Sequence, residues 1–145
     1  MSEDYQIRHS APAVTDYRRL RTGSGLNDKS YEAAVLGLAG SWYAVTITAG
    51  ASGMPVGMGR IVGDGGCHFQ IVDVCVLPEH QGRGLGRRIM QELTTELERR
   101  APATAYVSLI ADGDAQHLYR KFGFVDTAPD SIGMARTCRQ KARTS

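Results

Sequence analysis

The sequence predicts an α/β domain whose central sheet is mixed, mostly antiparallel, and covered by helices on both faces. First, residues 71–77 read as a strand, and a Gly-rich turn then leads into a long helix that runs to Leu97. Second, the β-rich segments 41–48 and 56–62 are joined by short turns to each other and to a strand over 67–77, which indicates an antiparallel meander. The full predicted order is strand, two helices, three strands, helix, strand, helix, strand, which is typical of a two-sided sheet.

The N-terminal elements are inferred from shorter patterns. Residues 5–9 alternate weakly and predict a first strand, and residues 13–21 have the apolar spacing of a helix. A Gly- and Ser-rich turn follows. Asp28 or Ser30 is then expected to cap the second helix, because both side chains can accept from its first N–H groups.

The long helix is expected to bury one face, and the C-terminal elements follow it. Its apolar residues recur every four positions; they are Leu85, Ile89, Leu93 and Leu97. Proline ends this helix at 101–102, and residues 105–110 predict another strand. A short helix over 115–122 and a closing strand from 123–125, extended by 132–135, complete the fold.

Composition excludes several classes of function. The chain has 145 residues, 42% of them hydrophobic, which predicts a single domain over 1–136. The polar and basic residues 137–145 are expected to form a flexible tail. The net charge of the chain is +2. A nearly balanced charge gives no support for a nucleic-acid or membrane partner. No apolar run reaches the roughly 20 residues of a membrane span and no signal-peptide core is visible, so a cytoplasmic location is expected. The cysteines are odd in number and lack ligand spacing, which argues against disulfides and a metal site.

The turn before the long helix has the composition of a phosphate site. In the segment 81–86 (QGRGLG), glycines alternate with larger residues, and Arg83, Arg87 and Arg88 lie in or beside it. Unpaired N–H groups and the positive end of the helix dipole favour an anion at such a position. The dinucleotide fingerprint fails because its last glycine would fall on Arg87, and the Gly-Lys-Ser/Thr of a P-loop is missing. A plain Gly-rich turn with solvated arginines is the alternative.

Two motifs in this part of the chain resemble the GNAT N-acetyltransferase superfamily. Gln81, Gly84 and Gly86 match its Gln/Arg-x-x-Gly-x-Gly/Ala loop, and the preceding residues 76–78 (VLP) match as well. Residues 118–124 (LYRKFGF) are similar to a helix motif that follows the fifth strand of the family. The resemblance implies the GNAT fold, acetyl-CoA as co-substrate, acetyl transfer to an amine, and a homodimer.

The resemblance also implies a set of cofactor contacts. The loop amides would bind the CoA pyrophosphate, and the exposed backbone of residues 74–76 would pair with the pantetheine arm, with the Val76 N–H polarising the acetyl carbonyl. Asp112 stands where many members have an asparagine. The implied cofactor-binding residues are Val74, Cys75, Val76, Gln81, Gly82, Arg83, Gly84, Leu85, Gly86, Arg87, Asp112 and Tyr119.

The catalytic residues implied are Tyr119 and Asp73. A protonated phenol can give its proton to the departing CoA sulfur, although Tyr119 could instead be a packing residue. Asp73 interrupts an apolar strand, and three roles are open to it: general base, ligand of the substrate ammonium, or structural ion pair with Arg60. Gln70 lies near the position where many members carry a glutamate, and it cannot act as a base.

The acceptor is expected between the first two helices and the hairpin strands. Tyr31, Arg60 and Asp73 are the candidate substrate-binding residues, and Trp42, Tyr43 and Asp64 are further candidates for the walls. These aromatic residues favour a hydrophobic or aromatic primary amine of a small molecule, acetylated in a ternary complex without a metal. The alternatives are a protein N-terminal or lysine acetyltransferase and a non-catalytic CoA-binding sensor.

Overall fold

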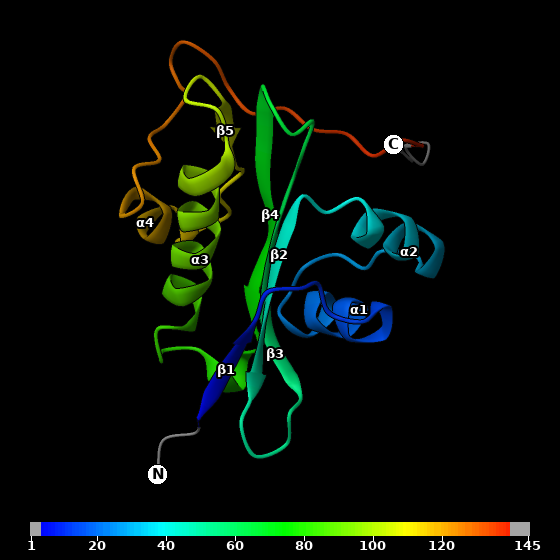
Figure 1. Cartoon of the computed structure of the whole chain (residues 1–145). Coiled ribbons are helices and arrows are strands. Elements are labelled where there is room, and N and C mark those ends of the chain that lie inside the picture. The colour runs from blue at the N-terminus through cyan, green and yellow to red at the C-terminus, as the bar shows by residue number, and fades with distance from the viewer. Residues whose placement is uncertain (1–3, 140–145) are drawn as a thin grey trace.

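A five-stranded sheet with strand order β1-β2-β3-β4-β5 organises the chain (Figure 1). The computed structural model describes residues 4–139. In chain order its elements are β1 (Tyr5–Arg8), α1 (Val14–Gly23), α2 (Tyr31–Ala39), β2 (Tyr43–Ala49), β3 (Pro55–Gly63), β4 (His68–Val76), the 3-10 turn η1 (Pro78–His80), α3 (Leu85–Arg100), β5 (Tyr106–Ser108) and α4 (Ala115–Arg120).

The sheet confirms the predicted meander and adds a short parallel strand. β1 to β4 pair with their neighbours in antiparallel fashion. Within residues 4–139, β5 pairs with β4 only where Tyr106–Ser108 lies beside His68–Gln70, and this pairing is parallel. From Ile71 onward, the edge of β4 that faces away from β3 is therefore without a strand neighbour.

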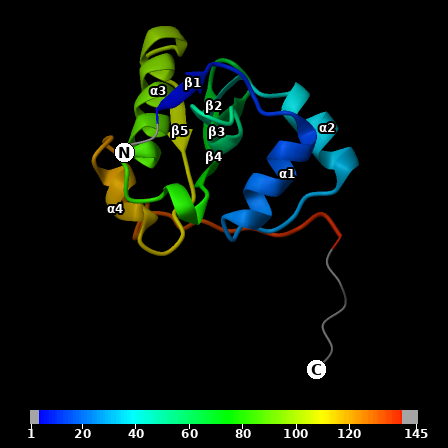
Figure 2. The same ribbon diagram turned by 90° about the horizontal axis from the view of Figure 1, so that it is seen from below.

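Helices cover both faces of this sheet. α3 and α4 lie on one side and α1 and α2 on the other (Figures 1 and 2). The four apolar residues that the helical spacing predicted are buried in α3, where they pack against Ile47, Ile61 and Phe69 of the sheet. The core on the α1 side is smaller and is built around Leu20, Met58 and Cys75. Of the two predicted caps for α2, the structure uses Ser30, whose side chain accepts from the Ala33 N–H.

The predicted closing strand is wrong. After α4 the described chain contains no strand, and it runs from the α4 side of the sheet to the α1–α2 side (Figures 1 and 2). Ile132 and Met134 are 70% and 85% exposed. β5 has only three residues, so its outer edge offers few ladder groups, and Pro129 has no N–H to donate. The part of the predicted tail from residue 140 onward lies outside the described residues.

Across residues 4–139, we find no helix with both the length and the apolar character that a membrane crossing requires.

Candidate active site

The Gly-rich loop has the backbone that its sequence predicts. Gly82 and Gly84 have φ angles of 77° and 78°, in the left-handed region that favours glycine. A Cβ atom at either position would have open space around it, so the missing side chains leave the backbone accessible. The first helical hydrogen bond of α3 runs from the Arg88 N–H to the Gly84 carbonyl, at 3.1 Å. The N–H groups before Arg88 therefore precede the hydrogen-bonding ladder of the helix, as an anion site requires.

The side chains in and after this loop differ in burial and in their contacts. Arg87 and Arg88 are exposed, whereas Leu85 is buried in the core and anchors the start of α3. The Gly86 Cα faces α4, since a Cβ there would lie 3.4 Å from Leu118 Cδ2. Arg83 Nη1 donates to the hydroxyl of Tyr5 at 2.8 Å, which ties the loop to β1.

The open edge of β4 presents backbone groups next to this loop. The Leu77 N–H donates to the Val56 carbonyl at 2.9 Å. Because hydrogen-bonded and non-hydrogen-bonded pairs alternate along antiparallel strands, the next pair, Gly57–Val76, exchanges no hydrogen bonds. The N–H and carbonyl of Val76 consequently point away from β3, toward the open edge. The side-chain amide of Gln81 occupies that carbonyl at 3.0 Å. The motif glutamine thus fixes the loop to the end of the strand.

A β-bulge changes the direction of the β4 side chains. The register against β3 shifts so that both Asp73 and Val74 stand opposite Gly59, and Asp73 has a φ of 62°. A Cβ on Gly59 would lie 2.6 Å from Ile89 Cγ2, so a larger residue at this point would require α3 or the strand to shift. Before the bulge Phe69 belongs to the core below α3; after it Cys75 belongs to the core below α1. The bulge therefore turns the Asp73 carboxylate toward α1.

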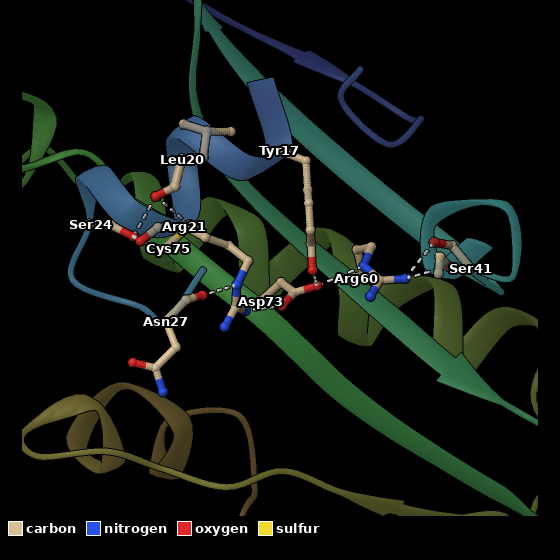
Figure 3. Close-up of polar contacts among 10 residues, drawn as sticks. Tyr17, Leu20, Arg21, Ser24, Asn27, Ser41, Arg60, Asp73 and Cys75 are labelled. Carbon is tan, nitrogen blue, oxygen red and sulfur yellow. Dashed lines mark hydrogen bonds and ion pairs between the residues drawn. The ribbon is translucent and has the colours of Figure 1, made fainter. Parts of the chain in front are cut away.

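Asp73 is the centre of a buried polar network (Figure 3). Its Oδ1 accepts from Arg21 Nη1 at 2.6 Å, and its Oδ2 accepts from Arg60 Nε at 2.7 Å and from the Tyr17 hydroxyl at 2.9 Å. The carboxylate is 6% exposed, and the two guanidinium side chains are 11% and 10% exposed. The structural ion pair of Asp73 with Arg60 is thus confirmed, and Arg21 and Tyr17 extend it.

The backbone holds both arginines in fixed orientations. Arg21 Nε donates to the Asn27 carbonyl at 2.7 Å. Arg60 Nη1 donates to the Gly37 carbonyl at 3.1 Å and to the Ser41 hydroxyl at 2.9 Å. Burial raises the pKa of the Tyr17 phenol, and the negative charge of Asp73 and its hydrogen bond add to this rise.

A cavity of about 570 Å³ joins this network to Tyr119. Its lining residues come from α1, the loop after α1, β3, β4, and the segment from β5 into α4; they are Tyr17, Arg21, Leu26, Lys29, Arg60, Val62, Gln70, Ile71, Val72, Asp73, Val74, Leu109, Ile110, Asp112, Ala115 and Tyr119. Burial raises the pKa of the Tyr119 phenol, and the negative charge of Asp112 acts in the same direction. The Tyr119 hydroxyl therefore keeps its proton at neutral pH and can donate it.

Five predicted site residues line this cavity; they are Arg60, Asp73, Val74, Asp112 and Tyr119. Val76, to which the resemblance gave the oxyanion contact, is not among the residues that line this cavity, whereas Val74 is. Cys75 is buried, and its thiol donates to the Leu20 carbonyl at 3.7 Å, as expected of a small core residue.

The structure does not bring the expected aromatic wall to this cavity. None of the four residues proposed for it besides Arg60 and Asp73 lines the cavity; they are Tyr31, Trp42, Tyr43 and Asp64. Tyr31 is 62% exposed at the start of α2. Trp42 packs against Phe69 and Arg100, and Asp64 accepts three backbone N–H groups in the β3–β4 turn.

The α1 wall of the cavity was missed in the sequence. Tyr17 and Arg21 are four residues apart and share one face of α1. The apolar spacing that predicted this helix does not identify Arg21 as a site residue. The distance in sequence between Arg21 and Asp73 hides their pairing. The available signal was Arg21 itself, a cationic residue that directly follows the apolar Leu20 of this helix.

The described residues fit a CoA-type co-substrate in two places, the open loop backbone and the free edge of β4. Among residues 4–139, no group of three or more histidine, cysteine, aspartate or glutamate side chains could hold a metal ion.

Comparison with known proteins supports the same family. The family model of the acetyltransferase (GNAT) domain matches residues 40–126. A chloroplastic serotonin N-acetyltransferase 2 of rice, Oryza sativa subsp. japonica, is 38% identical over 98 residues, which are 66% of this chain and 48% of that protein. An uncharacterized N-acetyltransferase, ycf52, of Porphyra purpurea is 36% identical over 77 residues, covering 53% of this chain and 42% of its own length. The chain thus spans less than half the length of these two curated relatives.

Solved structures extend the likeness over nearly the whole chain. A probable acetyltransferase from meticillin-resistant Staphylococcus aureus superposes with a TM-score of 0.87 at 40% identity, covering 92% of this chain and 99% of that one. A GNAT family acetyltransferase of Streptococcus pneumoniae gives a TM-score of 0.73 at 25% identity, over 94% and 100% of the two chains. With the loop, the open strand edge and the matched domain, this chain belongs to the GNAT acetyltransferase family.

Proposed function

We propose that this protein transfers the acetyl group of acetyl-CoA to a primary amine of a small molecule, by direct attack within a ternary complex. The observation that carries the proposal is the cavity in which the half-buried Tyr119 and the free edge of β4 meet, next to the Gly-rich loop. The name of the rice relative, a serotonin N-acetyltransferase, supports a small primary amine as the acceptor class.

The loop and the strand edge would hold the co-substrate. The backbone around Gly82 and Gly84 is open, and Arg87 is exposed beside the first turn of α3, so a pyrophosphate would meet both N–H groups and positive charge. The pantetheine arm contains amides and would hydrogen-bond to the Val76 N–H on the open edge. The thioester would then reach the bulge at Val74, which lines the same cavity as Tyr119.

Tyr119 would act as the general acid. In the transfer, the amine nitrogen bonds to the thioester carbon and loses a proton, the carbon–sulfur bond breaks, and the sulfur leaves as a thiolate that takes up a proton. The Tyr119 hydroxyl is protonated at neutral pH and lies in the cavity wall, so it can supply that proton.

Direct attack is favoured over an acetylated enzyme because the nearest cysteine is a poor nucleophile. Burial raises the pKa of the Cys75 thiol to about 11, and Cys75 does not line the cavity. Reaction at a cysteine requires the thiolate form and access to it.

Asp73 would serve as a positioning residue. Its two oxygens accept from two guanidinium groups and a phenol, which leaves this carboxylate engaged in orienting Arg21 and Arg60. Its geometry thus favours a structural role over that of general base.

The test is a thiol-release assay with acetyl-CoA and a panel of amines, including a peptide with a free N-terminus and a lysine side chain. We expect turnover with small primary amines, intersecting lines in two-substrate kinetics, and a fall in kcat on the order of 100-fold for Tyr119→Phe. The control is Tyr106→Phe, an exposed tyrosine of β5 outside the cavity, which should retain wild-type kcat.

Acetyl-CoA affinity should be unchanged in Tyr119→Phe, because the loop holds the co-substrate. Turnover only with the peptide would indicate a protein acetyltransferase. Tight acetyl-CoA binding without turnover of any amine would indicate a sensor, and either result would overturn the proposal.

A further inference from the structure

We propose that the acceptor carries an anionic group, a carboxylate or a phosphate, in addition to its amine, and that Arg21, Arg60 and Lys29 bind this group on the α1 wall of the cavity. This inference rests on the proposed function and specifies its substrate class.

The first argument is the charge of the wall. Arg21 and Arg60 share a single carboxylate, that of Asp73, so one positive charge of the buried network is not neutralised. Lys29 adds a second cation to the lining. The other acidic residue of the lining is Asp112, which lies on the Tyr119 side between β5 and α4. An excess of buried positive charge is costly unless an anion offsets it.

The second argument is the unused donors of the two guanidinium groups. Arg21 donates through Nε and Nη1, and Arg60 also donates through Nε and Nη1. No hydrogen bond is formed by either Nη2 atom with any residue in the described part of the chain, as Figure 3 illustrates for the residues it draws. No side-chain nitrogen in that part is both fully buried and unpaired, so these Nη2 atoms are not fully buried.

The third argument is preorganisation. Each arginine is fixed by Asp73 on one side and by a backbone carbonyl on the other, that of Asn27 or Gly37. A guanidinium that is already oriented loses little conformational entropy when it binds an anion, and its planar donors match carboxylate and phosphate oxygens. An ion pair that only stabilised the fold would need one arginine for one aspartate. The second arginine therefore leaves one positive charge available to an anionic ligand.

This charge also bears on the acetyl transfer itself. Cations near the amine favour its neutral form, which is the nucleophile, because a like charge disfavours the ammonium. The proton then leaves the amine before binding. The acceptor enters as the neutral amine with its anion on the arginines, and the proton that its nitrogen loses on forming the amide replaces the one that Tyr119 gives to the sulfur.

The experiment compares acceptors that differ only in the anionic group. The pairs are tryptamine with tryptophan, which tests a carboxylate, and ethanolamine with phosphoethanolamine, which tests a phosphate. We expect the anionic member of at least one pair to have a kcat/KM about 10-fold or more above its partner, and this preference should shrink at high salt. The pair that shows the preference identifies the anion.

Two variants assign the preference to the wall. Lys29→Glu should raise KM for the anionic acceptor about 10-fold and leave KM unchanged for the partner that lacks the anionic group. Lys121→Glu, with the same charge change outside the cavity, is the control and should change neither value. Arg60→Met makes the network neutral and should act in the same direction; its thermal unfolding is measured alongside, because Arg60 is buried.

A binding measurement separates this inference from the proposed function. N-acetyltryptophan and N-acetyltryptamine, and N-acetyl-phosphoethanolamine and N-acetylethanolamine, are titrated into the protein with CoA present, without turnover. Tighter binding of an anionic member that is lost in Lys29→Glu would support the anion site even if no amine is acetylated. Equal binding within both pairs, or a preference for the uncharged members, would overturn it, while turnover of a simple amine with a Tyr119→Phe defect would leave the acetyltransferase proposal standing.

Discussion

The two faces of the sheet are lined by different kinds of side chain. The face below α3 is apolar throughout, and the helix contributes Leu85, Ile89 and Leu93, each at most 2% exposed. The face below α1 contains, besides a few apolar side chains, the buried network of Arg21, Arg60 and Asp73. The α3 face supplies stability by burying apolar surface, whereas the α1 face places charged groups beside the cavity.

The difference originates at one point of β4. Up to Ile71 the inward side chains of this strand join the α3 core, and the bulge at Asp73 moves the following inward side chain, Cys75, to the α1 side. Without the bulge, strict alternation would direct the Asp73 carboxylate into the apolar α3 core, where it would have no partner. The bulge at Asp73 thus allows one strand to contribute side chains to the apolar core below α3 and a carboxylate to the charged network below α1.

The largest effect is expected when the α1 network loses its anion. In Asp73→Ala the two guanidinium groups and the Tyr17 hydroxyl lose their shared acceptor while they stay buried, and removal of one partner from a buried pair typically costs about 3–5 kcal/mol. Urea titration followed by circular dichroism measures this change in the free energy of unfolding.

An exposed ion pair is the matched control for this variant. Asp28 is bonded to Arg18 on the surface, and Arg18 lowers the pKa of its carboxyl, so Asp28→Ala removes an aspartate–arginine pair without burial. Its unfolding midpoint should stay close to that of the wild type. Equal effects of the two substitutions would show that solvent reaches the Asp73 network freely.

A smaller loss is expected from overpacking the α3 face. In Gly59→Ala the new Cβ would lie 2.6 Å from Ile89 Cγ2 and 3.0 Å from Leu93 Cδ1, so α3 or the strand has to shift. Overpacking of this kind typically costs about 1–3 kcal/mol. Unfolding titrations measure the cost, and a neutral result would mean that the α3 face is looser than its burial indicates.

Gly37→Ala is the control, because a Cβ at this helical position of α2 has open space around it. Alanine also favours the helix over glycine by about 1 kcal/mol, so this variant should be as stable as the wild type or slightly more stable.

The α3 face could be predicted from the sequence because its signals are local. The four-residue spacing of Leu85 to Leu97 marks the buried stripe of α3, and the alternation of Gly82 and Gly84 predicts a backbone open to a ligand. Each of these patterns lies within one turn or one helix. The burial and the φ angles of these residues agree with what the patterns predicted.

The α1 face could be predicted only in part, because its contacts are long-range. The Arg60–Asp73 pair joins neighbouring strands and was foreseen as one of three roles, whereas the Arg21–Asp73 pair depends on how α1 packs on the sheet and was not. The aromatic residue Trp42 was assigned to the cavity from composition alone, and it packs instead in the α3 core. The closing strand failed because its apolar residues have no free strand edge long enough to pair with.

The smallest expected effect is the pH dependence of stability that comes from Cys75, a thiol buried on the α1 face. Burial raises the pKa of the Cys75 thiol from 9.0 to about 11. The folded protein then keeps this proton while the unfolded chain loses it, so the protonated thiol contributes stability that is fully present below pH 9 and is lost as the pH rises toward 11. Between these values the free energy of unfolding should fall by about 1.4 kcal/mol per pH unit because of this one group.

Cys75→Ala separates this contribution from that of the tyrosines, whose raised pKa values act over an overlapping range. Unfolding free energies of both proteins are measured from pH 8 to pH 11, and the difference between wild type and variant should decrease above pH 9. Ellman's reagent provides an independent test at pH 8, where the exposed Cys67 and Cys138 should react at once and Cys75 only after denaturant is added. Rapid reaction of all three thiols would mean that water reaches the strand below the Asp73 network, so the α1 face would not be dry.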